Sequence, residues 1–279
     1  MTKKWVYAFN EGDGKNKKLL GGKGANLCEM TQIGLRVPPG FVITTEACLA
    51  FLDDPKRVLP DGVMEQVRKN LADVEKKSGR TFGGRTNPLL VSVRSGAAMS
   101  MPGMMDTILN LGLNAETLQG LIAQTGNERF CYDAYRRFIQ LFGKVALNVP
   151  EADFDEEFNA VKVKANARHD VDLSAKDLAE IAERFLAVVK RNTGQPFPSN
   201  PHDQLEIAIR AVFNSWCGRR AVDYRREFRI TSDMANGTAV SVVEMVFGNM
   251  GNDSATGVAF TVTVTDDVAV LAPLVTVTV

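Results

Sequence analysis

The sequence predicts an α+β protein in which α/β segments flank an all-helical insertion. The apolar run PLLVSVR at 88–94 is typical of a buried strand, and residues 114–199 show only helical periodicity. Strand-like alternation returns after Gly237 with TAVSVVEMVF at 238–247. At 279 residues the chain exceeds the usual size of one domain, so we expect two lobes or one domain with an insertion.

Composition is typical of a soluble globular protein, with 45% hydrophobic and 24% charged residues. Lys plus Arg equals Asp plus Glu at 33 each, so net charge gives no reason to expect nucleic-acid or membrane binding. The N-terminal MTKKWVYAFNEGDG lacks the apolar run of a signal peptide, and no stretch approaches the roughly 20 apolar residues of a membrane span. The widely spaced cysteines argue against a zinc site or a disulfide framework: Cys28, Cys48, Cys131 and Cys217. We therefore expect a cytoplasmic protein.

The first third of the chain alternates between short strands and helices. Gly34 is a suitable C-terminal cap for a helix that precedes it. The expected elements are a strand at 5–9, a helix at 25–33, a turn into a strand at 37–45, and helices at 46–53 and 61–77.

The middle of the chain carries several helix start and stop signals. Asn114 can cap a helix that ends at Gly126, and Ser174 with Asp177 resembles a capping box. RFCYDAYRRFIQLFGKVAL has an aromatic stripe at helical spacing, which predicts helix-packing core. The expected elements are helices at 114–125, 129–147, 174–191 and 201–216, then strands at 238–247 and 257–264.

LLGGKGANL at 19–27 places one lysine among three glycines, just before a helical pattern. Glycine lets a ligand approach the backbone, and the start of a helix offers free N–H groups to an anion. Lys23 is therefore a candidate phosphate ligand. The motif is not a Walker loop, because Gly24 stands where the magnesium-binding hydroxyl would follow the lysine, and the same composition also suits an ordinary turn.

Arg94 ends the apolar strand and opens the loop RSGAAMSMPGMMDT. An arginine at this place either pairs with a buried carboxylate or faces a ligand in a cleft. Pro102-Gly103 makes the following segment a loop, and an apolar loop of this kind can pack on a base or on a partner domain. We call residues 97–106 the methionine loop, after its methionines at 99, 101, 104 and 105.

The two histidines lie in polar contexts at helix boundaries, so we expect His169 and His202 to be surface residues rather than catalysts. No Ser/His/Asp set, paired carboxylates or metal-ligand spacing stands out. The residues by themselves therefore predict a phosphate site without a complete catalytic set and without a metal site.

Four segments also resemble the N-terminal region of the pyruvate, phosphate dikinase family, in matching order and spacing over about residues 3–261. The related phosphoenolpyruvate synthases share the lysine loop and the VRS element but lack the continuation SMPGMMDT. The four segments are LLGGKGANLCEMTQIGLRVPPGFVITTEAC, LLVSVRSGAAMSMPGMMDTILNLGLN, ERFCYDAYRRFIQ and GTAVSVVEMVFGNMGNDSATGVAFT.

The resemblance implies an ATP-grasp fold, in which two α/β lobes hold ATP between them. It implies that Lys23 and Arg94 bind the ATP phosphates and that Met245 and Val246 line the adenine pocket. Val243 stands where the family usually has glutamine, which is a departure within the adenine segment.

The family reaction converts ATP, phosphate and pyruvate to AMP, pyrophosphate and phosphoenolpyruvate, with Mg²⁺ and a monovalent cation. It passes through a histidine on a separate swivelling domain and a pyruvate site on a C-terminal barrel. Neither domain matches a part of this chain, and the Mg²⁺ ligands are expected in the missing part.

The resemblance implies a first ATP-grasp lobe from 1–113 and 200–247, a helical insert at 114–199, and the start of an incomplete second lobe at 248–279. After GVAFT the sequence departs from the family, and from Val262 it is dominated by Val, Thr, Ala, Leu and Asp. This tail has high β propensity and predicts poor packing or an opportunistic edge strand.

We therefore expect a fragment that binds ATP, is inactive alone and is monomeric, although the full-length family is homo-oligomeric and also binds pyruvate and phosphate. Two alternatives stay open from the sequence: a related dikinase such as phosphoenolpyruvate synthase, and a non-catalytic nucleotide-binding fragment.

Overall fold

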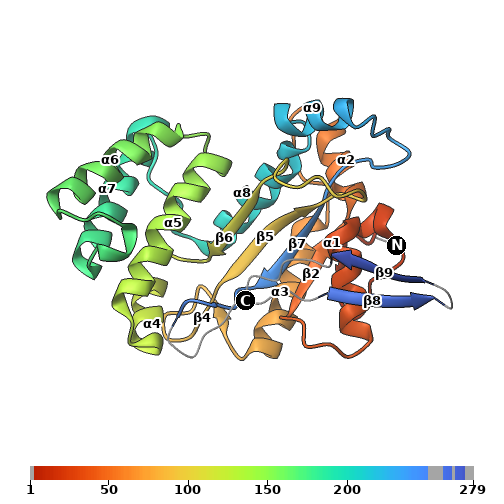
Figure 1. The fold of residues 1–279 in the computed structure, drawn as a ribbon, viewed down its shortest axis with the longest axis horizontal. Helices are drawn as coiled ribbons and strands as arrows, with labels where there is room; N and C mark the ends of the chain where they lie inside the picture. Colours follow the sequence, from red (N-terminus) through yellow and green to blue (C-terminus); the bar gives the residue numbers. More distant parts are fainter. Residues whose placement is uncertain (1–2, 251–259, 266–267, 274–279) are drawn as a thin grey trace.

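A five-stranded antiparallel sheet forms the centre of the fold, in the order β1-β2-β7-β5-β6 (Figure 1). This computed structural model describes residues 3–250, 260–265 and 268–273. The sheet with its surrounding helices confirms the predicted α+β class. Its strands are β1 (Val6–Ala8), β2 (Gly40–Ile43), β5 (Val91–Gly96), β6 (Thr107–Leu111) and β7 (Ala239–Glu244).

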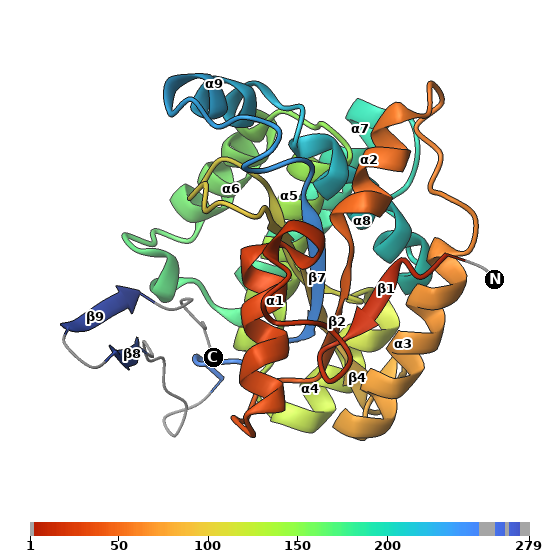
Figure 2. The same cartoon turned by 90° about the vertical axis from the view of Figure 1, so that its right-hand side faces the viewer.

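Helices cover both faces of the sheet. Side chains alternate along each strand, so each strand contributes apolar side chains to a core on either face. In β7, Val240 and Val242 face the larger core, whereas Ala239 and Val243 face the smaller one. Helix α1 (Lys17–Gln32) covers the smaller core, and α3 (Val63–Ser78) and α8 (Pro201–Ser215) lie against the opposite face (Figure 2). The remaining helices are α2 (Thr45–Asp53), α4 (Ala115–Thr125), α5 (Glu128–Ala146), α6 (Glu151–Lys164), the 3₁₀ helix η1 (Asp170–Asp172), α7 (Ala175–Thr193) and α9 (Arg219–Glu227).

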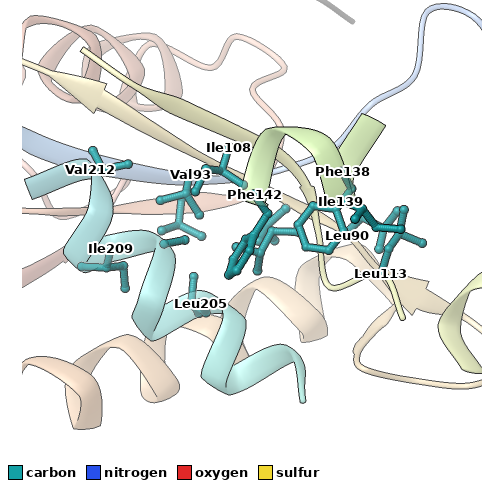
Figure 3. Close-up of a cluster of buried hydrophobic side chains, with 14 of the residues drawn as sticks. Leu90, Val93, Ile108, Leu113, Phe138, Ile139, Phe142, Leu205, Ile209 and Val212 are labelled. Atoms are coloured by element: carbon teal, nitrogen blue, oxygen red, sulfur yellow. The ribbon is translucent and has the colours of Figure 1, made fainter. Parts of the chain in front are cut away.

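The larger core joins the sheet to the helical part of the chain. Phe138 and Phe142 of α5 are fully buried in the larger core, where Phe142 lies near Val93 and Ile108 of the sheet and α8 lies beside them (Figure 3). The aromatic stripe of α5 is thus packing core, as predicted. A continuous core of this kind fixes the position of α5 relative to β5, the strand that carries Arg94.

Residues 114–199 contain α4, α5, α6, η1 and α7 and no strand, and α4–α7 lie to one side of the sheet (Figure 1). The predicted caps are confirmed. Asn114 accepts hydrogen bonds from the backbone N–H groups of Glu116 and Thr117, and Gly126 ends α4 in a left-handed conformation. The Ser174–Asp177 capping box begins α7.

Several predicted boundaries were wrong. The helix expected from residue 25 begins at Lys17, because Asn16 caps it and the glycine segment itself is helical apart from a kink at Gly21. Strand β6 was missed because a register shift and the left-handed Asn110 interrupt its alternation. Helices α6 and α9 were missed because both are largely polar, with few buried positions.

Residues 260–265 and 268–273 form one strand pair outside the main sheet. β8 (Phe260–Thr265) and β9 (Val268–Pro273) pair with each other in antiparallel register, rather than adding an edge to the five-stranded sheet. Residues 251–259, 266–267 and 274–279, on which part of the second-lobe and tail predictions falls, lie outside the described residues.

A second small sheet pairs β3 (Thr81–Phe82) with β4 (Pro88–Leu89) in parallel.

Across the described ranges, no helix combines the length and the apolar content that crossing a membrane requires.

Candidate nucleotide site

The glycine segment of α1 holds Lys23 against the end of β5. Gly21 has φ 66° and ψ 163°, a conformation that breaks the helix and is essentially restricted to glycine. A Cβ atom at this position would lie 1.8 Å from the carbonyl oxygen of Gly96. The backbone N–H of Gly22 donates to the carbonyl of Ala97 at 2.8 Å. The glycines therefore let α1 approach the strand closely enough to place Lys23 beside Gly96.

Lys23 lines a cavity of about 350 Å³, which we call the lysine cavity. The methionine loop forms much of the remaining wall. This segment is a loop, as the sequence predicts, and it lines the cavity. Its charged lining residues are Lys17 and Lys23, which gives a formal charge of +2 with no acidic side chain among them. The full lining is Lys17, Gly22, Lys23, Asn26, Ser95, Gly96, Ala97, Ala98, Met99, Ser100, Met101, Pro102, Gly103 and Met105.

Val93 of β5 faces the larger core, so the next residue, Arg94, points to the opposite face of the sheet. Helix α1, which carries Lys23, covers that face. Its Nε donates a hydrogen bond to Ser92 Oγ at 3.1 Å, which directs the guanidinium along β5 away from the lysine cavity. Among the described residues, no carboxylate contributes to the charge environment of Arg94 or of Lys23. The internal salt bridge that the sequence left open for Arg94 is therefore not found in this part of the chain.

Arg94 lines a second cavity of about 340 Å³, which we call the arginine cavity. Met245 and Val246 line it as well, so the structure brings three of the four predicted site residues together. Phe130 and Phe247 form an aromatic corner of this cavity, with ring centroids 5.0 Å apart and planes at 83°. Its remaining lining residues are Leu109, Asn110, Asp133, Ala134, Arg137, Gly248 and Asn249.

The charge of Arg94 acts on Lys23 although the two side chains line different cavities. Burial lowers the pKa of Lys23, and repulsion from the Arg94 charge lowers that pKa further, while the side chain keeps access to solvent. Burial also lowers the pKa of Arg94. Two like charges held close together without a counter-charge favour the arrival of an anion.

Binding of the same phosphates would bring both head groups to one cleft, and the structure instead places them in two cavities, with Arg94 lining one and its neighbours Ser95 and Gly96 lining the other. The hydrogen bond from Arg94 to Ser92 is the physical reason for this difference.

Sequence reasoning missed Asp133 and Arg137, which line the arginine cavity from α5. Arg137 Nε donates to Asp133 Oδ2 at 2.9 Å, and Asp133 also pairs with Arg136. The charged lining residues Arg94, Arg137 and Asp133 together give a formal charge of +1. The available signal was an Asp and an Arg at i and i+4 on the polar face of a helix, which the aromatic stripe of the same helix obscured.

No group of three or more His, Cys, Asp or Glu side chains suited to a metal ion occurs within the described residues. His169 precedes η1, and His202 packs against Phe82 with centroids 5.3 Å apart. Neither histidine lines the lysine cavity or the arginine cavity. The two cavities thus combine positive charge at Lys23 and Arg94 with aromatic surface at Phe130 and Phe247.

The sequence profile described as "Pyruvate phosphate dikinase, AMP/ATP-binding domain" matches residues 17–59 and 55–273. The chain belongs to this family. Its membership supports the ATP-grasp-like description of the sheet and its covering helices, and confirms the resemblance inferred from the sequence motifs.

Curated relatives support the same conclusion. The chain is 63% identical over 256 residues to "Pyruvate, phosphate dikinase" of Entamoeba histolytica, covering 92% of this chain and 29% of the relative. It is 50% identical over 259 residues to the Clostridium symbiosum protein of the same name, with the same two coverages. It is 51% identical over 264 residues to "Pyruvate, phosphate dikinase 1, chloroplastic" of Zea mays, covering 93% of this chain and 28% of the relative. The chain therefore spans less than a third of the length of these relatives.

Proposed function

We propose that this chain binds ATP across the lysine and arginine cavities. Lys23 and Arg94 contact the phosphates, and Met245 and Val246 contact the adenine. The observation that carries the proposal is the pair of neighbouring cations, Lys23 and Arg94, which have no carboxylate partner among the described residues. Family membership in an AMP/ATP-binding domain supports the same ligand.

The chemistry of the two cavities supports this division of the ligand. The lysine cavity has a formal charge of +2 and suits the phosphates, which carry most of the negative charge of ATP. The arginine cavity offers flat and apolar surfaces at Phe130, Met245 and Phe247, against which a base can stack. Arg94 lies on the strand that joins them, where it can contact phosphate oxygens from the base side.

In the complete protein, we propose that this ATP site serves the dikinase reaction, in which ATP, phosphate and pyruvate give AMP, pyrophosphate and phosphoenolpyruvate. Cations on the phosphates offset the charge that grows during phosphoryl transfer. Mg²⁺ would supply further charge neutralisation, and we propose that its ligands lie outside the described residues.

Several finer assignments are part of the same proposal. We propose a first lobe from 1–113 and 200–247 with a helical insert at 114–199, which the absence of strands from 114–199 supports. We also propose a cytoplasmic location and a monomeric state for this chain. We propose no nucleic-acid or membrane partner, which the balanced charge supports.

Calorimetric titration of the purified chain with ATP, AMP and adenosine tests the proposal. We expect affinity to fall in that order, because each removed phosphate takes away charge that the lysine cavity attracts. Equal affinity for ATP and adenosine would contradict the phosphate assignment, and binding of none of the three would contradict the function.

We also expect the 279 residues alone to produce no phosphoenolpyruvate, because neither histidine lies at the described cavities. An assay with ATP, phosphate, pyruvate and Mg²⁺ should show no turnover above that of the Lys23→Ala variant. Turnover above this control would contradict the expectation.

A further inference from the structure

A third cavity, of about 390 Å³, lies between the C-terminal end of α5 and one face of α8. We call it the α5/α8 cavity. Its walls include the aliphatic side chains of Val145 and Ile207, and its charged lining residues are Arg210 and Asp106. None of these residues lines the lysine cavity or the arginine cavity, so this cavity is separate from the proposed nucleotide site.

Arg210 presents a guanidinium with unused hydrogen-bonding capacity. Its Nε is buried without a hydrogen-bond partner, and its ion-pair partner among the described residues, Glu206 Oε1, lies 3.8 Å away on the same helix. Arginine stays charged at all ordinary pH values and matches carboxylate geometry with two parallel N–H donors. Apart from this long pair with Glu206, the guanidinium has no partner among the described residues, and the side chain is 38% exposed, so its terminal N–H groups are suited to a ligand carboxylate.

Asp106 supplies the opposite charge. Its backbone N–H donates to Ser215 Oγ at 3.4 Å, and its Oδ1 accepts from Arg220 Nη2 at 2.7 Å, which holds the carboxylate beside the C-terminal end of α8. Arg210 lies five residues before Ser215, a rise of about 7.5 Å along the helix. Helix α5 also ends at this cavity, and the last carbonyl groups of a helix carry partial negative charge that favours an ammonium group.

We propose that the α5/α8 cavity binds a small zwitterionic amino acid. The ligand carboxylate pairs with Arg210, its ammonium lies beside Asp106, and its aliphatic side chain packs against Val145 and Ile207. A simple dianion is disfavoured by Asp106 and a simple amine by Arg210, whereas a zwitterion can meet Arg210 with its carboxylate and Asp106, which also pairs with Arg220, with its ammonium. This inference goes beyond nucleotide binding and does not depend on it.

Methyl-labelled NMR of the 279-residue chain tests the proposal with L-valine as the probe, because the Ile207 methyl resonances report directly on the cavity. We expect L-valine to shift them in a saturable way. Two control ligands each lack one charge: 3-methylbutanoate has no ammonium, and isobutylamine has no carboxylate. Each should bind at least about tenfold more weakly, since each loses one charge-assisted contact. Absence of a saturable shift with L-valine, or equal binding of either control ligand, would overturn the proposal.

Two variants locate the binding contacts. Arg210→Gln should weaken L-valine binding by about tenfold or more, and Ala211→Phe should block the cavity sterically. Arg219→Gln is the matched control, because the Arg219 side chain is 94% exposed and lies outside the cavity. Binding of L-valine by Arg210→Gln at the affinity of the unmodified chain would also overturn the proposal. The ligand comparison on the unmodified chain decides the question even where a variant fails to fold.

Discussion

Replacement of Gly21 by alanine should be among the most damaging single-methyl additions to this fold. An L-residue at φ 66° and ψ 163° costs about 1–3 kcal/mol in backbone strain. The added Cβ would also lie 1.8 Å from the Gly96 carbonyl oxygen, and forcing α1 away from β5 costs about another 1–3 kcal/mol. We therefore expect Gly21→Ala to lower the free energy of unfolding by about 2–6 kcal/mol, measured by urea denaturation.

Two other glycines of the same region separate the contributions. At Gly22 the nearest atom to an added Cβ is 3.4 Å away, so Gly22→Ala should change stability by less than about 1 kcal/mol. At Gly34 nothing lies within 4 Å, but φ is 86°, so Gly34→Ala should show only the left-handed cost of about 1–2 kcal/mol. Equal stability of Gly21→Ala and Gly34→Ala would show that the close approach of α1 to β5 does not depend on Gly21.

Two further predictions concern the core and one acidic group. Phe142→Ala should lower the free energy of unfolding by about 3–5 kcal/mol, because Phe142 is fully buried. Phe228→Ala should lower it by less than about 1 kcal/mol, because Phe228 is 61% exposed. Equal losses of stability in thermal unfolding would contradict the core assignment. Burial raises the pKa of Glu244 above its ordinary 4.5, against the lowering effect of Arg80. Ionisation of Glu244 therefore destabilises the folded state as pH rises through 4.5 toward neutrality. The free energy of unfolding of Glu244→Gln minus that of the unmodified chain should increase over that range. A constant or falling difference in urea denaturation would refute this prediction.

Local signals predicted much of the fold because they act within a few residues. The cap at Asn114, the capping box at Ser174 and the proline start of α8 are all found where the sequence places them. Helix α9 escaped prediction because it is largely polar and buries only Ala221, and strand β6 because its apolar alternation is interrupted. In β6, the register shift and the left-handed Asn110 disrupt the alternation that would have revealed it.

The site was predictable at the level of residue type but not of arrangement. Glycine spacing and a strand-terminal arginine pointed to Lys23 and Arg94, and the structure places both on one face of the sheet. Their separation into two cavities depends on the Arg94 hydrogen bond to Ser92, a side-chain rotamer choice that sequence patterns do not encode. The contribution of Arg137 depends on how α5 packs on β6, which is a long-range property of the fold.

The most direct test of the account is ATP affinity after removal of each cation. We expect Lys23→Ala and Arg94→Ala each to weaken ATP binding by about 1–3 kcal/mol, roughly 5- to 150-fold in Kd, the range for charge-assisted hydrogen bonds. Lys69→Ala and Arg68→Ala, which remove the same charges from the exposed face of α3, should leave the affinity unchanged. The proposed nucleotide site is contradicted if the α3 variants weaken ATP binding as much as the site variants, or if none of the four changes it.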